Sequence, residues 1–366
     1  MSQPQRYLRA FVSDCEGPLS KNDNAFEITT HFLPNGAYFF SLVSKYDDIQ
    51  ADVVKRPEYK AGDTLKLIAP FLKAFELTNK KIEEYSAKNL ILIHGVREML
   101  HTVRKRTPSF IVSTSYEQYL SAFCSLIDFP QSNVYCTKLD LDKYSIDAVE
   151  IEELKQLEEK ITSLPMIEIP TGSTSLDQFS SKDQETIHQL DKIFWTEIPH
   201  MIVGTMLKEI TPMGGIKKAY AVRDVAKRVN CDLREIMYVG DSITDAEAFE
   251  TIKKEGGLTI SFNGNKYAIR RAEVAVLSKN TMVIALLADL FSNVGKEGVL
   301  NLVTEWNYQS LEQYCSDKTL IKTVTHQPQK TLPHVELVSN RNMDRLSELS
   351  ECYRKTVRGE AIGRLG

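Results

Sequence analysis

The sequence predicts an α/β fold in which a parallel β-sheet carries helices on both faces and further domains are inserted into it. Short apolar segments of strand length alternate with amphipathic segments of helix length, which is typical of strand–helix–strand units. Polar residues follow directly after several apolar segments, as they do at the carboxyl edge of such a sheet. Two long stretches, 21–89 and 139–204, interrupt the alternation, and 366 residues suffice for more than one core.

The first half of the predicted sheet contains two strands and the helix between them. The segment 7–14 is a short apolar strand that ends at an acidic residue, and Gly17 lies in the turn that breaks it. The segment 95–106 places its apolar side chains on one helical face. A second strand, Ser109–Ser113, follows and is apolar until it ends in a Ser-Thr-Ser sequence.

The second half of the sheet begins with the amphipathic helix 217–230. The strand Glu235–Val239 follows, and two more apolar runs come after it, Leu258–Phe262 and Glu273–Leu277. In sheets built this way, the functional site lies outside the carboxyl ends of the strands. We therefore expect polar residues that are distant in sequence to meet at that edge.

The two insertions are predicted to be helical caps. The first, 21–89, contains a stripe of Leu, Ile and Phe over Leu65–Leu77, and the second, 139–204, contains two predicted helices, Glu150–Ile161 and Gln184–Trp195. A Pro-, Gly-, Ser- and Thr-rich loop joins the two helices of the second insertion. The rest of the chain is assigned to the core, 1–20, 90–138 and 205–290, and to a mostly helical C-terminal extension, 291–366.

Composition excludes several classes of partner. The net charge is −4, whereas binding to nucleic acid or to an anionic membrane requires a basic face. No apolar run approaches the ~20 residues of a membrane span, and we expect no signal peptide. The six cysteines show neither CxxC nor zinc-ligand spacing, so we expect free thiols in a cytoplasmic protein.

Two acids follow the first predicted strand, Asp14 and Glu16. A carboxylate at a strand end, with a second acid two residues later, suits phosphoryl transfer. The first acid can attack phosphorus, and the second can protonate the leaving oxygen and then activate water. Taken alone, the signal is weak, because an acid after a strand more often only caps a loop.

Two further acids, Asp241 and Asp245, follow the strand Glu235–Val239. Together with oxygen atoms from the first loop, their carboxylates could form the oxygen-rich octahedral site that Mg²⁺ prefers. The alternative is structural, because Asp and Ser are also favoured residues at the N-terminus of a helix.

The remaining polar candidates suit a phosphate site. The hydroxyl of Ser113 and the backbone N–H groups that follow it, beginning with Thr114, can hold phosphate oxygens. Lys218 or Lys217, at the start of the helix 217–230, can neutralise phosphate charge. Each residue also has an ordinary interpretation, as a serine at a strand end or as a lysine exposed to solvent.

In combination, these motifs resemble those of the haloacid dehalogenase (HAD) superfamily, because all four occur in the order and context of that family. The resemblance covers roughly 7–20, 90–138 and 205–280, and the run 260–278 is similar to phosphoserine phosphatase relatives. It implies an α/β core with a parallel Rossmann-like sheet, inserted caps and a Mg²⁺ cofactor. The roles it implies are a nucleophile (Asp14), an acid/base (Glu16), phosphate ligands (Ser113 with Thr114, and Lys218 rather than Lys217) and metal-site residues (Asp14, Glu16, Asp241 and Asp245).

The resemblance implies a phosphohydrolase that acts on a small phosphorylated metabolite. One departure is Glu16, since the family's phosphatases have Asp at this position. The whole chain, with its DCEGPLS opening, is also similar to archaeal HAD proteins named as subunit R of energy-converting hydrogenase A, a name that establishes no reaction. The alternative function is therefore a weakly active or non-catalytic subunit that binds a partner complex.

Overall fold

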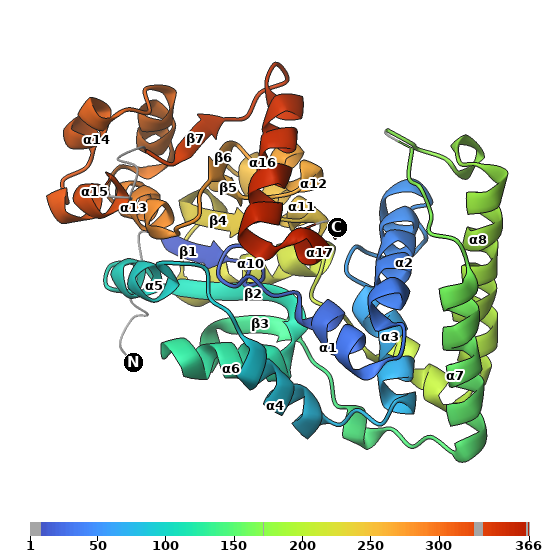
Figure 1. The fold of residues 1–366 in the computed structure, drawn as a ribbon. Coiled ribbons are helices and arrows are strands. Elements are labelled where there is room, and N and C mark those ends of the chain that lie inside the picture. The colour runs from blue at the N-terminus through green and yellow to red at the C-terminus, as the bar shows by residue number, and fades with distance from the viewer. Residues whose placement is uncertain (1–8, 171, 326–331, 364, 366) are drawn as a thin grey trace.

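The computed structural model describes residues 9–170, 172–325, 332–363 and 365. In this part of the chain a single sheet has the strand order β3-β2-β1-β4-β5-β6-β7 (Figure 1). The first six strands in this order are parallel to one another, and the last, β7, is antiparallel to β6. The predicted fold class is thereby confirmed. The strands are β1 (Ala10–Ser13), β2 (Ser109–Tyr116), β3 (Val134–Thr137), β4 (Ile236–Gly240), β5 (Leu258–Phe262), β6 (Val274–Leu277) and β7 (His334–Leu337).

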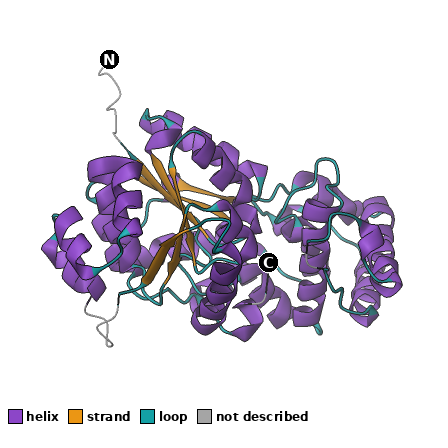
Figure 2. Ribbon diagram, turned by 90° about the horizontal axis from the view of Figure 1, so that it is seen from above, coloured by secondary structure: helices purple, strands orange, loops and turns teal. Residues whose placement is uncertain are grey.

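Helices cover both faces of the sheet (Figure 2). Successive side chains of a strand point to opposite faces, and in β1 Phe11 and Val12 belong to two different hydrophobic cores. Because both faces are buried, the central strands are continuous apolar runs and do not alternate with polar residues. One face carries α5 (Val96–Arg104), α6 (Glu117–Ile127) and α13 (Met282–Thr304), and the other carries α10 (Ile216–Val229), α11 (Ala246–Lys254) and α12 (Lys266–Arg271).

The two insertions share one hydrophobic core and form a single helical lobe, which we call the cap. Tyr46 from the first insertion stacks on Phe194 from the second, with ring centroids 5.7 Å apart. The fraction of surface that a domain buries rises with its size, so packing the two insertions together removes more apolar surface from water than either could alone. The cap contains α1 (Asn24–Phe32), α2 (Gly36–Asp48), α3 (Thr64–Ala74), α7 (Ala148–Ser163), α8 (Ser181–Lys192) and α9 (Met206–Glu209).

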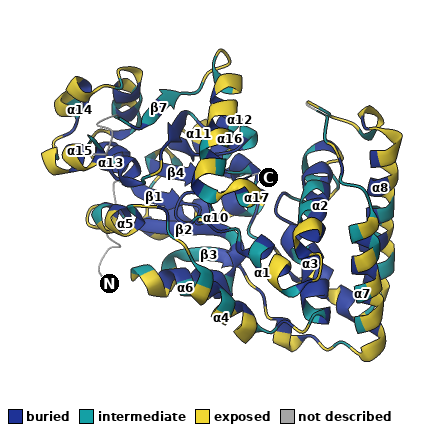
Figure 3. Ribbon diagram, viewed as in Figure 1, coloured by how far each residue is buried: buried dark blue, intermediate teal, exposed yellow. Residues whose placement is uncertain are grey.

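The burial pattern distinguishes the two faces of the cap. In Figure 3 the outward faces of α7 and α8 are exposed, whereas the helices nearer the sheet are largely buried. One helix of the first insertion, α4 (Asn79–Asn89), packs against α6 of the core instead. No helix in the described ranges combines the length and the apolar character that a membrane span requires.

The C-terminal segment 291–366 contains several helices and also adds β7 to the edge of the sheet. This strand has four residues and is only partly buried, so its sequence lacks the continuous apolar run of the central strands. Helix α13 crosses the boundary expected near 290. Helix α16 packs against α12 and β6, and its last turn reaches the carboxyl edge of the sheet. The helices beyond α13 are α14 (Tyr308–Tyr314), α15 (Lys318–Thr325), α16 (Met343–Arg358) and α17 (Glu360–Gly363).

Candidate active site

A cavity of about 110 Å³ lies between the carboxyl edge of the sheet and the cap. Five of the residues singled out from the sequence line it, namely Asp14, Glu16, Ser113, Thr114 and Asp241. The other two, Lys218 and Asp245, lie next to Asp14: Lys218 forms ion pairs with both Asp14 and Asp245. The parallel sheet thus brings together side chains that are more than 200 residues apart in sequence.

Asp14 follows β1 directly and is only 4% exposed. One carboxylate oxygen, Oδ1, accepts a hydrogen bond of 2.6 Å from the backbone N–H of Cys15, and Oδ2 accepts one of 2.5 Å from Nζ of Lys218. Burial raises the pKa of Asp14 to about 7, although the charge of Lys218 opposes this change. The group is therefore a carboxylate above neutral pH and faces the cavity from the end of a rigid strand.

Lys218 lies in the first turn of α10 and is fully buried. Its Nζ atom bridges Asp14 and Asp245, with a distance of 2.7 Å to Oδ1 of Asp245. Burial lowers the pKa of Lys218, but the charges of the two carboxylates outweigh burial and raise it above its ordinary value. The lysine is therefore a fixed positive charge beside Asp14. The neighbouring Lys217 is partly exposed and forms no ion pair within the described residues.

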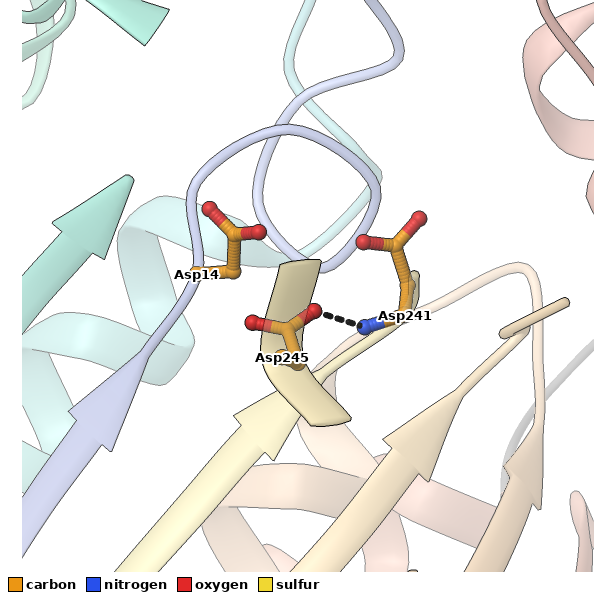
Figure 4. Close-up of side chains that lie close together, drawn as sticks. All are labelled: Asp14, Asp241 and Asp245. Atoms are coloured by element: carbon orange, nitrogen blue, oxygen red, sulfur yellow. Dashed lines mark hydrogen bonds between the residues drawn. The ribbon is translucent and has the colours of Figure 1, made fainter. Parts of the chain in front are cut away.

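Asp245 accepts hydrogen bonds at both carboxylate oxygens. Besides Lys218, Oδ1 accepts from the hydroxyl of Tyr238 at 2.7 Å. Oδ2 accepts from the backbone N–H groups of Asp241, at 2.9 Å, and of Ser242, at 3.1 Å. Figure 4 shows the bond to Asp241. Asp245 therefore holds Lys218 and the loop after β4 in place.

The three aspartates offer a cluster of oxygen ligands. One carboxylate oxygen from each of Asp14, Asp241 and Asp245 lies within 4.8 Å of the others, and Figure 4 shows Asp14 and Asp241 converging above the strand ends. Gly17 makes this approach possible, because it has a φ of +100° and a Cβ there would lie 2.1 Å from Oδ2 of Asp241. Hard carboxylate oxygens in this arrangement fit a Mg²⁺ ion.

Glu16 links the loop after β1 to the cap. Its Oε1 atom accepts a 2.6 Å hydrogen bond from the backbone N–H of Asn24, the first residue of α1. Burial raises the pKa of Glu16 well above its ordinary value, and the charge of Asp23 raises it further. A raised pKa favours the protonated form, which is the form that a general acid needs.

The strand β2 supplies Ser113 and Thr114. Both residues line the cavity, and the Oγ atom of Ser113 accepts a 3.4 Å hydrogen bond from the backbone N–H of Ser115. The hydroxyl of Thr114 donates to the backbone carbonyl of Met213 at 3.1 Å, which ties β2 to the loop before α10. The strand continues to Tyr116, so Ser113 lies within it and not at its end.

Two arginines that sequence reasoning missed, Arg354 and Arg358, reach the cavity from the last two turns of α16. Both side chains are 4% exposed, and both donate to Oδ2 of Asp241, Arg358 at a distance of 3.2 Å. The only signal in the sequence is the spacing of four residues, which places two arginines on one face of a helix. That spacing does not reveal that the helix returns to a carboxylate 113 residues upstream.

The cap contributes acids that were also missed. Asp47 and Asp48, from the last turn of α2, line the cavity opposite the sheet. Asp47 accepts hydrogen bonds from the hydroxyl of Tyr59, at 2.6 Å, and from the backbone N–H of Gly62, at 2.9 Å. Burial raises the pKa of Asp47 to about 7. The cavity therefore has acidic groups on both its core side and its cap side.

Comparisons with known proteins found similar solved structures. A solved structure of a gene product from Archaeoglobus fulgidus is 27% identical, with a TM-score of 0.79, and the match covers 100% of this chain and 99% of that chain. Phosphoserine phosphatase in its apo form is 12% identical, with a TM-score of 0.45, and covers 75% of this chain and 96% of its own. A phospho-aspartyl intermediate analogue of phosphoserine phosphatase is 13% identical, with a TM-score of 0.46, covering 76% and 98%.

No curated protein matches the chain, and the structural matches do not test the resemblance to hydrogenase subunits. The model of the haloacid dehalogenase-like hydrolase family matches residues 76–289, which is more than half of the sequence. The chain therefore belongs to the haloacid dehalogenase-like hydrolases.

Proposed function

We propose that the chain is a Mg²⁺-dependent phosphatase that hydrolyses a small phosphate monoester through an aspartyl-phosphate on Asp14. The observation that carries this proposal is the buried carboxylate of Asp14, held by Lys218 at 2.5 Å beside Asp241 at the base of a cavity. A carboxylate nucleophile needs a fixed cation, room for a phosphoryl group and a nearby proton donor. Lys218, the cavity and Glu16 meet these three needs.

In the first step, a carboxylate oxygen of Asp14 attacks phosphorus, and the bond between phosphorus and the leaving oxygen breaks. Glu16 gives its proton to that oxygen, so the alcohol leaves in neutral form. Lys218, the hydroxyl of Ser113 and the backbone N–H of Thr114 hold the phosphoryl oxygens. Burial raises the pKa of Glu16, which supports this role because a higher pKa favours the protonated form.

In the second step, Glu16 is a carboxylate and removes a proton from a water molecule. That water attacks phosphorus, the bond to Asp14 breaks, and inorganic phosphate leaves. The two steps restore Asp14 as a carboxylate and Glu16 as an acid. Because Glu16 is hydrogen-bonded to the first residue of α1, movement of the cap would also move the proton donor.

The metal ligands proposed are the carboxylates of Asp14 and Asp241 and the backbone carbonyl of Glu16, with Asp245 acting directly or through water. When bound there, Mg²⁺ offsets the negative charge of the phosphoryl oxygens. Both oxygens of Asp245 already accept hydrogen bonds, which favours the indirect role for this residue.

The test is the substitution Asp14→Asn, because the amide has nearly the same shape but is a poor nucleophile. Phosphate release from a panel of monoesters, with and without millimolar Mg²⁺, should disappear while the far-ultraviolet circular dichroism stays unchanged. Asp232→Asn is the matched control, since Asp232 is at the surface and its side chain is 60% exposed. Wild-type activity in Asp14→Asn would remove Asp14 as nucleophile, and a folded protein that binds no Mg²⁺ would refute the metal site.

One observation supports the alternative of a weakly active subunit that binds a partner complex. Glu16 is one methylene longer than the aspartate of related phosphatases, and a displaced acid/base group costs turnover. If this alternative is right, the panel should give little phosphate release with or without Mg²⁺. The protein purified from its own cells should then bring a defined partner complex with it.

A further inference from the structure

Helix α16 places two guanidinium groups on a single carboxylate oxygen. Arg354 and Arg358 both donate to Oδ2 of Asp241, and all three side chains are buried. Asp241 is also one of the three aspartates that form the oxygen cluster. In the metal-free protein, the arginines therefore supply the positive charge that this buried carboxylate needs.

The two arginines differ in their contacts besides Asp241. Arg358 also donates from Nε to the backbone carbonyl of Lys21, at 3.0 Å, and from Nη2 to the carbonyl of Asn22. Arg354 donates from Nη1 to the backbone carbonyl of Asp241, at 3.3 Å, and from Nη2 to the carbonyl of Leu365, at 3.4 Å. Its Nε atom is buried without a hydrogen-bond partner in the described part of the chain. A buried donor without a partner is costly, so this guanidinium has capacity for another acceptor.

Charge determines which acceptor suits Arg354. A divalent cation at the oxygen cluster would lie close to a guanidinium on the same carboxylate, and like charges in a site shielded from water repel strongly. A phosphate dianion reverses this balance, because guanidinium groups bind phosphate oxygens with paired, charge-assisted hydrogen bonds. The cavity that Arg354 lines is the one lined by Ser113 and Thr114.

We propose that Arg354 is a phosphate-binding residue. It forms an ion pair with Asp241 in the metal-free protein and contacts the phosphoryl group when metal and phosphate are bound. Arg358, tied to the backbone, remains as the anchor of α16. Mg²⁺ and phosphate then bind cooperatively, because phosphate draws Arg354 away from Asp241. This inference rests on the proposed function, since it places the substrate's phosphoryl group in this cavity.

The experiment measures binding and needs no turnover. Isothermal titration calorimetry of Arg354→Gln should show Mg²⁺ bound at least about fivefold more tightly than in wild type without phosphate, the lower end of common couplings between linked sites. Inorganic phosphate, titrated in saturating Mg²⁺, should bind at least about fivefold more weakly. The matched control is Arg345→Gln, which removes the same charge from an arginine of α16 that is 52% exposed and pairs with Glu336.

Opposite changes in the two affinities are the expected result. If Arg354 only stabilises the fold, both ligands should bind more weakly, and if it has no role, neither affinity should change. Either of these outcomes in a cooperatively melting variant would overturn the inference. If Arg354→Gln does not fold, the wild type still tests it, because phosphate should tighten Mg²⁺ binding at least about fivefold. Equal Mg²⁺ affinity with and without phosphate would overturn the inference.

These outcomes are separate from those of the proposed function. A protein that hydrolyses monoesters but shows unchanged affinities in Arg354→Gln refutes only the role of Arg354. A protein that shows the expected affinity changes but releases no phosphate from any monoester refutes only the catalytic proposal.

Discussion

Replacing Lys218 by methionine tests the electrostatic core of the site. The lysine is fully buried, and its Nζ atom lies 2.5 Å from Asp14 and 2.7 Å from Asp245. Methionine retains a similar length without the charge. The substitution leaves two carboxylates facing each other in a buried site, and removing one partner of a buried ion pair costs about 3–5 kcal/mol. We expect the free energy of unfolding of the metal-free protein to fall by about that amount at pH 9.

The loss should be smaller at pH 5.5. Asp14 has a pKa of about 7 even with the lysine present, and the positive charge of Lys218 lowers that pKa. Without the lysine the pKa of Asp14 rises further, so at pH 5.5 Asp14 is neutral and the substitution leaves less uncompensated negative charge in the site. Turnover should fall by at least about 10²-fold at neutral pH, the usual effect of removing one stabilising donor. The higher pKa of Asp14 in the variant adds to this fall, because a protonated Asp14 is a poor nucleophile.

The measurements are urea unfolding followed by circular dichroism at pH 9 and pH 5.5 in EDTA, and phosphate release with Mg²⁺. Lys217→Met is the matched control, because Lys217 precedes Lys218 in the same helix and is partly exposed. A Lys218→Met variant as stable and active as wild type would refute this reasoning. A larger loss in Lys217→Met would assign the role to the other lysine.

Two further predictions concern Glu16 and the pH dependence of stability. Glu16→Gln should lower phosphate release by roughly 10²–10⁴-fold, less for an aryl phosphate with a good leaving group, while Mg²⁺ binding survives. Glu16→Asp should change the rate as well, upward if glutamate is a handicap and downward if the pocket fits the longer side chain, and equal rates in all three proteins would exclude a proton-transfer role. The free energy of unfolding of the metal-free protein should fall as the pH rises from about 4 to about 7. Burial raises the pKa of Asp14 and of Asp47 from 3.8 to about 7, so the folded state binds more protons than the unfolded chain in this window. Each group contributes a slope of up to about 1.4 kcal/mol per pH unit, and stability in EDTA that instead rises between pH 5 and 8 would contradict this assignment.

The sequence alone predicted the sheet and the part of the site that lies at strand ends. Strands β1 and β4 are buried on both faces, so each is a continuous apolar run that ends at a polar residue, Asp14 or Asp241. Parallel strands share their carboxyl edge, so local patterns were enough to predict that these residues meet. The family resemblance favoured Lys218 over Lys217, and in the structure Lys218 lies between Asp14 and Asp245.

Contacts between distant segments could only be decided by the tertiary structure. The apolar stripes of the two insertions show that each buries a face, but a stripe does not identify its partner, and only packing shows that they share one core. The same limit applies to Arg354 and Arg358, whose spacing indicates a common helix face but not its destination. Helix α16 reaches Asp241 because it packs against α12 and β6, and those contacts depend on the position of every strand between them.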